Sequence, residues 1–193
     1  MLSISNAESV DVGDRILTAA ASCVGDFGVR RVTLAEIARR AGVSRPTVYR
    51  RWPDTRTILA ALLTDRIIGA WREVPMHGMG RDALVQRITA VAGRLRRDEL
   101  VRTVLRSAPE LAMVYISERL GTSQQMLIDV VAEELRTAQA DNSVRRADPR
   151  ALAAMVLLIA QSTIQSGQIV EPILDADALS VELSHTLNGY LCP

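Results

Sequence analysis

Two closely spaced helix-start signals, at Thr33 and Ser44, constrain the fold of this chain more than any other feature. Glu36 follows Thr33 by three residues, a spacing that predicts a capping box, in which each side chain bonds the other residue's backbone N–H. Gly42 predicts a turn, because glycine adopts a left-handed backbone at little cost. Pro46 fits the first turn of a second helix, where its missing N–H breaks no bond. We therefore expect two short helices joined by a tight turn.

The apolar residues of the same segment predict a small core shared by the two helices. Leu34, Ile37, Val43 and Val48 have the spacing of inner-face residues, and Ala38 is small enough for a close helix crossing. Two helices held at such an angle form a helix-turn-helix, whose second helix enters the major groove of DNA. The segment therefore predicts a DNA-binding module.

The distribution of charge supports this interpretation. The net charge is only +1, but eight arginines and two acids lie between residues 28 and 56, a local charge of +6, and residues 73–193 carry −3. A basic segment on a neutral body is typical of nucleic-acid-binding proteins. The chain has no lysine, and arginine donates paired hydrogen bonds to phosphate or guanine. A merely solvated helix face would also explain the arginines, but here they coincide with the turn, cap and core positions.

The second helix presents the candidate DNA contacts. Arg45 and Thr47 are at its N-terminal end, and we expect them to read base edges. Tyr49, Arg50 and Arg51 are better placed for phosphates. The complete expected set of DNA-binding residues is Thr33, Ser44, Arg45, Pro46, Thr47, Tyr49, Arg50, Arg51 and Arg56.

Helical periodicity continues through nearly all of the chain and predicts an all-α fold. Aromatic residues make up only 3% of a chain that is 48% hydrophobic, so the core must be mainly aliphatic. We expect an N-terminal helical DNA-binding domain over residues 1–56 and a larger C-terminal helical domain over residues 57–193. The predicted helices cover residues 12–27 (capped by Asp11), 33–42, 44–52, 54 to about 73, 84–95, 99–107, 110–139 with a break at Gly121, 149–166 and 178–191, with a loop at 74–80.

The last two helices predict a homodimer. Residues 149–166 are apolar almost all the way round, and such a helix must be covered on every side. The last helix carries Leu179, Leu183, Leu187 and Leu191 on one stripe. We expect a surface near residues 149–166 and 178–191 to be shared with a second copy.

Several residues of the C-terminal domain are predicted to be buried although their side chains are polar or soft, and they are the candidates for lining an effector pocket. Residues of these types are more often ordinary core or interface, since methionine fills core gaps and glutamine bonds to backbone. Trp71 either lines the pocket or anchors the junction with the DNA-binding module. The candidates are Trp71, Met113, Tyr115, Met126, Gln161, Thr163 and Gln165. An apolar or mixed small molecule is expected, with no identity assigned.

The sequence gives no reason to expect an enzyme, a metal site or a cofactor. His77 and His185 have no neighbours at ligand spacing, and Cys23 and Cys192 match no metal or redox spacing. We expect Cys23 to be a small buried thiol. The N-terminus has no signal-peptide pattern, and the longest apolar run, 151–160, is shorter than the roughly 18 residues that a membrane span needs. A cytoplasmic location is expected.

About a quarter of the chain resembles the tetracycline-repressor (TetR) family of bacterial regulators, at residues 15–20, 27–28, 33–38, 41–44, 46–49, 52 and 58–59. The resemblance implies three DNA-binding helices, a larger domain with a ligand cavity, and a homodimer through the last two long helices. It also implies that the helix opened by Ser44 is the recognition helix, with Tyr49 on phosphate. Thr55 stands where this family commonly has lysine, and Arg51-Trp52 where it often has His-Phe.

Three functions remain open from the sequence. The first is a ligand-released repressor that binds a pseudo-palindromic operator as a homodimer. The second is an activator or regulator of the same fold without an effector. The third is a helical enzyme or partner-binding protein with an inactive helix-turn-helix, and the sequence offers no residues for turnover.

Overall fold

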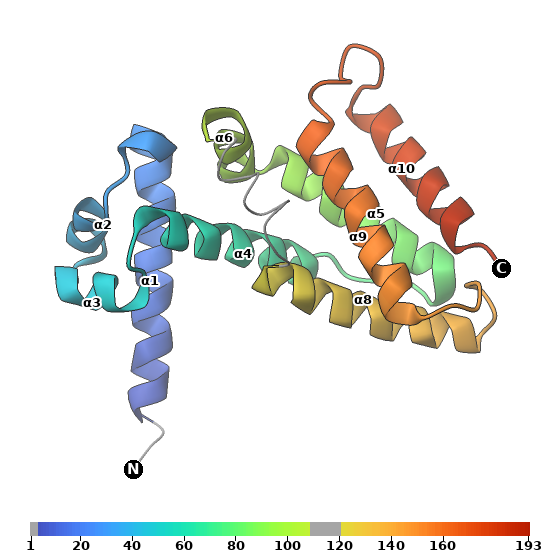
Figure 1. Ribbon diagram of the computed structural model, residues 1–193, viewed down its shortest axis with the longest axis horizontal. Helices are drawn as coiled ribbons and strands as arrows, with labels where there is room; N and C mark the ends of the chain where they lie inside the picture. The colour runs from blue at the N-terminus through green and yellow to red at the C-terminus, as the bar shows by residue number, and fades with distance from the viewer. Residues whose placement is uncertain (1–3, 109–120) are drawn as a thin grey trace. The chain divides into compact units, whose positions relative to one another are not determined.

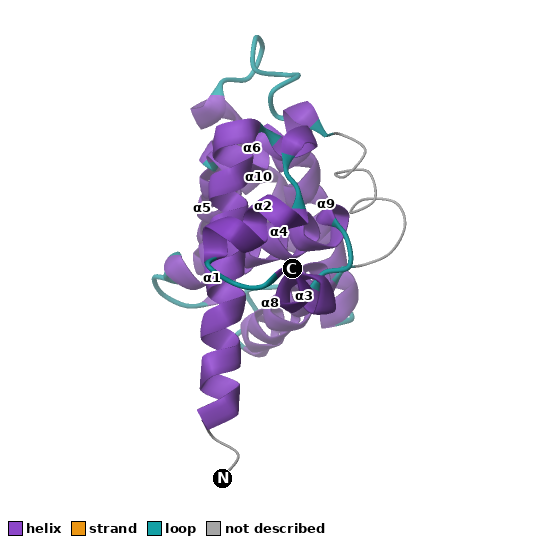
Figure 2. Cartoon of the chain, turned by 90° about the vertical axis from the view of Figure 1, so that its left-hand side faces the viewer, coloured by secondary structure: helices purple, strands orange, loops and turns teal. Residues whose placement is uncertain are grey.

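The computed structural model describes residues 4–108 and 121–193, and in these residues it contains helices and connecting loops but no strand (Figure 2). The all-α prediction is confirmed. The helices are α1 (Ile4–Phe27), the 3-10 turn η1 (Val29–Arg31), α2 (Leu34–Ala41), α3 (Arg45–Arg51), α4 (Thr55–Glu73), α5 (Gly80–Arg97), α6 (Glu99–Ser107), α8 (Thr122–Ala140), α9 (Pro149–Ser166) and α10 (Ala176–Leu191). None of the described helices is both long enough and apolar enough to cross a membrane.

Contacts divide the described chain into two compact units, residues 4–65 with 99–108, and residues 66–98 with 121–193. Helix α4 begins in the first unit and ends in the second. The functional boundary expected after residue 56 stays a prediction.

The first unit surrounds one aliphatic core. Helix α1 packs on α2, and α2 packs on α3, with α2 and α3 beside α1 in Figure 1. Ile16 and Cys23 of α1, Ile37 of α2 and Val48 of α3 have no exposed surface. Cys23 is buried as expected, and burial raises the pKa of its thiol, as desolvation does for any group that ionises to an anion.

Helix α6 also belongs to this first unit. Leu100, Val104 and Ala108 join the core formed by α1, α2, α3 and α4, and Arg30 Nε donates a hydrogen bond to the Ser107 carbonyl at 3.1 Å. The sequence predicts α6 as a helix but does not predict which unit it joins.

Helix α1 is longer than expected. It begins at Ile4, so the prediction that Asp11 caps a helix starting at residue 12 is wrong. Residues 4–11 contain no glycine or proline, and nothing in the local backbone chemistry stops the helix there.

The second unit is a bundle in which α5 contacts α8, α9 and α10, and α9 contacts α8 and α10. Asp148 caps α9 by accepting a hydrogen bond from Arg150 N, with Pro149 at the first position, as predicted. Asp175 caps α10, which begins at Ala176, two residues before the predicted start. The expected loop separates α4 from α5.

The leucine stripe of α10 faces the interior of its own subunit. Leu179, Leu183, Leu187 and Leu191 are all buried in the single chain, so this stripe is internal core. The stripe does not supply the expected shared surface, and contact with a second copy stays a prediction.

Candidate DNA-binding interface

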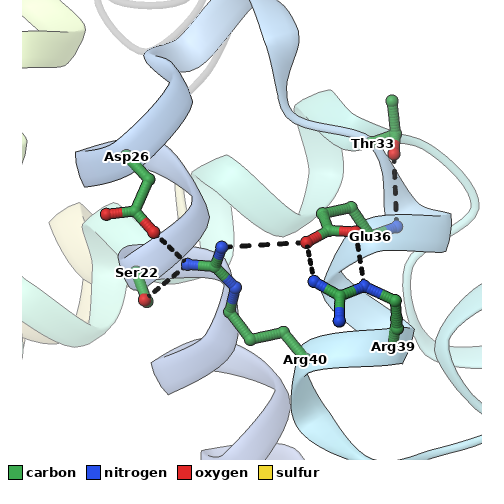
Figure 3. Close-up of polar contacts among 6 residues, drawn as sticks. All are labelled: Ser22, Asp26, Thr33, Glu36, Arg39 and Arg40. Carbon is green, nitrogen blue, oxygen red and sulfur yellow. Dashed lines mark hydrogen bonds and ion pairs between the residues drawn. The ribbon is translucent and has the colours of Figure 1, made fainter.

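The start of α2 is fixed by Thr33, but only half of the expected capping box forms. Thr33 Oγ1 accepts a hydrogen bond from Glu36 N at 3.2 Å. The Glu36 carboxylate instead accepts from Arg39 Nε at 2.8 Å and Arg39 Nη2 at 2.6 Å (Figure 3). A guanidinium one turn along the helix attracts the carboxylate more strongly than a neutral backbone N–H does. The same hydrogen bond lowers the pKa of Glu36.

The turn and the cap of α3 form as predicted. Gly42 ends α2 in the left-handed region, with φ 65° and ψ 36°. Ser44 Oγ accepts a hydrogen bond from Thr47 N at 3.3 Å and lies 2.8 Å from Thr47 Oγ1. Pro46 is in the first turn. The Thr47 hydroxyl is therefore part of the cap, which leaves its methyl group as the atom most available to a base.

Helix α3 is held by one face and exposed on the others. Val48 is fully buried, whereas Tyr49 is 49% exposed. Arg45, Pro46 and Arg50 are exposed as well. This division leaves the polar side of a short helix open to a ligand as large as a DNA duplex.

Three arginines of α3 and the start of α4 are available for contacts outside the chain. Over residues 4–108 and 121–193, the side chains of Arg45, Arg50 and Arg56 form no ion pair, and all three are exposed. Arg56 lies in the first turn of α4, which Asp54 caps by accepting from Thr57 N at 2.7 Å. That hydrogen bond is the main reason why the pKa of Asp54 is lowered.

Other arginines of the segment are engaged within the first unit. Arg39 pairs with Glu36 and Arg40 with Asp26. Arg15, outside the basic run, holds α1 to the end of α2 through a hydrogen bond from Nη2 to the Ala41 carbonyl at 2.8 Å. The sequence could not separate these residues from the available ones, because it does not show where α1 and α2 place their acids.

Arg51 differs from its neighbour Arg50. It is half-buried, and its guanidinium lies so near α1 that a Cβ added to Gly13 would be 2.6 Å from Arg51 Nη1. Arg51 thus leans on α1, whereas Arg50 is exposed. That Arg51 contacts a phosphate stays a prediction.

Trp71, the first of the expected effector residues, is buried near the end of α4 and packs against Arg87. It is 8% exposed, and Arg87 Cζ lies 4.2 Å from its ring centroid. Arg87 donates to the carbonyls of Trp71 at 2.9 Å and Val74 at 3.0 Å, and pairs with Glu134 at 2.7 Å. Burial raises the pKa of Glu134 although Arg87 opposes the shift.

The other expected effector residues that the structure describes lie on α8 and α9. Met126 is 42% exposed, and Gln161 Oε1 accepts a hydrogen bond from Gln124 Nε2 at 2.8 Å. Thr163 Oγ1 donates to the Ile159 carbonyl at 2.8 Å, and Gln165 is half-buried. Met113 and Tyr115 lie outside the described residues.

Sequence reasoning missed the half-buried pair Arg87 and Glu134 and the buried Gln124. Arg87 shares its helix with Arg94, Arg96 and Arg97, and no pattern distinguishes the inward arginine from the others.

Comparison with known proteins agrees with this geometry. The family described as "Bacterial regulatory proteins, tetR family" matches residues 16–62, the helix-turn-helix with its flanking helices. A helix-turn-helix-type transcriptional regulator of Mycobacterium bovis is 65% identical over 192 residues, covering all of both chains. The chain belongs to the TetR family. One from Mycobacterium tuberculosis matches to the same extent. TetR-family proteins are DNA-binding transcriptional regulators and not enzymes.

Solved structures of transcriptional regulators share the fold. The repressor QsdR of R. erythropolis superposes with a TM-score of 0.69 at 16% identity, covering 92% of this chain and 94% of that one. AlkX of Dietzia sp. gives 0.68 at 22% identity, covering 91% and 92%. FadR of Bacillus subtilis, solved with stearoyl-CoA, gives 0.62 at 20% identity, covering 92% and 98%. At these identities the likeness concerns the fold alone.

Proposed function

We propose that this TetR-family regulator is a homodimeric repressor whose two α3 helices read half-sites in successive major grooves of a pseudo-palindromic operator. The observation that carries the proposal is the exposed face of α3, where Arg45 and Arg50 form no ion pair with any described residue while Val48 holds the helix to the core. Half-sites read in this way lie about 34 Å apart, one turn of the duplex.

The homodimer is supported by apolar side chains that a single subunit leaves uncovered. Met155 and Leu158 on α9 are 42% and 57% exposed, and Val181 on α10 is 65% exposed. Large exposed apolar residues gathered on two neighbouring helices are typical of a protein–protein interface. The dimer face we propose lies on the exposed sides of α9 and α10. The leucine stripe packs α10 against the rest of its own subunit.

Release by a small molecule bound in the second unit completes the proposal. A ligand that binds better to a conformer with a different α3 spacing lowers DNA affinity by the ratio of its affinities for the two conformers. We place the protein in the cytoplasm, where the operator is.

The test is a footprint of the purified protein on the DNA that flanks its own gene. The proposal predicts protection of an inverted repeat whose half-site centres are about 10 base pairs apart or a multiple of that, and lower transcription of the flanking genes in its presence. Protection of a single unrepeated site contradicts the dimer, and higher transcription identifies an activator instead. A broad panel of compounds that leaves the footprint unchanged favours a regulator without an effector.

A further inference from the structure

Helix α2 ends with two adjacent arginines that make different contacts. The side chain of Arg39 is 71% exposed and that of Arg40 only 23%. Arg39 is held within α2 by the two oxygens of Glu36. Arg40 reaches across to α1 (Figure 3). The two residues carry the same charge, so a difference in their roles must come from their different contacts.

Arg40 joins α2 to three side chains near the end of α1. Its Nη1 donates to Ser22 Oγ at 2.7 Å and to Asp26 Oδ2 at 2.5 Å. Its Cζ lies 5.2 Å from the centroid of the Phe27 ring, within the range of a cation–π contact. On the α2 side, Nη2 is 3.7 Å from Glu36 Oε1. The planar guanidinium fixes its partners in direction as well as distance.

The angle between α2 and α1 determines where α3 points. Helix α3 packs on α2, and the turn between them is closed by hydrogen bonds from Gly42 N to the Arg39 carbonyl and from Val43 N to the Ala38 carbonyl. A change in the seating of α2 on α1 therefore moves α3, whose exposed side chains are the candidate DNA contacts.

We propose that Arg40, held by Asp26 and Ser22, is a positioning residue for operator recognition and does not contact phosphate. Arg40 fixes the orientation of α2 and α3 on α1, so that the side chains of α3 contact the base edges in the correct register. This inference rests on the proposed operator binding.

Substitution of Asp26 gives a test in which long-range electrostatics and the positioning role predict opposite changes in operator affinity. Asp26→Asn removes a negative charge from the DNA-binding unit, so long-range electrostatics alone predicts tighter binding to any duplex. The same substitution removes the charged partner of Arg40, so the positioning role predicts weaker binding to the operator. Asp14→Asn is the matched control, because Asp14 is exposed on the same helix and makes no ion pair with a described residue.

The experiment uses the full chain and a duplex selected by the wild-type protein from a random pool. Dissociation constants are measured on that duplex and on a scrambled duplex of the same composition. We expect Asp26→Asn to lower the ratio of specific to non-specific affinity by roughly three- to tenfold, the range for residues that act on a binding site without touching the ligand. Asp14→Asn should keep the wild-type ratio.

Salt dependence separates positioning from phosphate contact. A residue that neutralises one phosphate contributes about 0.9 to the slope of log K against log salt. Arg40→Gln should lower the specificity ratio and leave this slope on the scrambled duplex unchanged, and Arg39→Gln should alter neither. A lower slope for Arg40→Gln overturns the proposal.

The failures of the two proposals are distinguishable. If the wild-type protein selects no duplex, operator binding itself is overturned. If it selects one and Asp26→Asn binds it as Asp14→Asn does, only the positioning role of Arg40 is overturned. Melting temperatures of all variants identify any that fold poorly, and Asp26→Asn, which keeps the shape of the side chain, then carries the test without Arg40→Gln.

Discussion

Arg45 and Tyr49 test the two kinds of DNA contact proposed for α3, one with a base and one with a phosphate. Both are exposed on α3, Arg45 at the end that enters the groove first. Arg45→Ala should weaken binding to the selected operator by about 1–3 kcal/mol and relax the preference at one base position. Tyr49→Phe should weaken all duplexes alike, because a lost phosphate contact carries no sequence information.

The measurement is a titration of each variant on operators that differ at single base pairs. Arg72→Ala is the control, since Arg72 is an exposed arginine in the last turn of α4. If Arg45→Ala keeps the wild-type base preferences at every position, Arg45 does not read a base.

The cap that Asp54 forms at the start of α4 should make the stability of the protein depend on pH. The hydrogen bonds that the Asp54 carboxylate accepts from Thr57 lower its pKa below the ordinary value of 3.8. A carboxyl group with a lowered pKa in the folded state contributes stability above its unfolded pKa, and the contribution is lost as the pH falls through the folded value. Asp54→Asn should therefore lower the melting temperature at pH 7, and the difference from wild type should shrink below about pH 4. A difference that is constant between pH 7 and pH 3 contradicts this.

At the scale of elements, the turn between α2 and α3 depends on a single glycine. Gly42 has φ 65°, and Arg15 Nη2 would lie 3.4 Å from a Cβ at this position. Gly42→Ala should destabilise the protein by about 1 kcal/mol, since a side chain strains the left-handed conformation. Gly25→Ala is the control, because its helical position has open space. Equal free energies of unfolding for the two variants in urea would contradict the account of the turn.

The elements also show what the sequence determines. Caps at Thr33, Ser44 and Asp148 are encoded by residues a few positions apart, so local chemistry predicts where α2, α3 and α9 begin. The missing hydrogen bond of the capping box, between the Glu36 side chain and the Thr33 backbone, also has a local cause. Arg39 and Arg40 follow Glu36 by three and four residues and compete for its carboxylate. The assignment of α6 to the first unit depends on contacts far apart in the chain, and helical periodicity does not report those.

At the scale of the whole molecule, the proposed dimer is tested through α9. Leu158 is 57% exposed, and Leu158→Asp places a charge in the proposed interface, where burial without a partner is costly. We expect the variant to sediment as a monomer, or to dimerise at least tenfold more weakly than wild type, an effect of about 1.4 kcal/mol.

Val130→Asp is the matched control for this prediction. Val130 is 41% exposed and lies on α8, outside the proposed interface. Dimerisation that is unaffected by Leu158→Asp, or equally weakened by Val130→Asp, would place the interface elsewhere.

The surroundings of the candidate effector residues could not be predicted from the sequence, and the reason is physical. The sequence predicts that Gln161 lines an effector pocket, but which residues of a helical bundle face a common space depends on how α5, α8 and α9 pack. Helical periodicity identified α9 as apolar, yet it did not reveal that Gln161 would bond Gln124 or that Trp71 would lie beneath Arg87.

The central claim is that α3 meets DNA through Arg45 and Arg50, which form no ion pair with a described residue. The salt dependence of DNA binding tests it most directly. Wild type, Arg50→Ala and Arg39→Ala are compared on one duplex over a range of salt concentrations. The account predicts a steep wild-type slope, a slope lower by about 0.9 for Arg50→Ala, and a wild-type slope for Arg39→Ala, whose charge is already paired with Glu36. A flat wild-type slope, or the same loss for both variants, would contradict it.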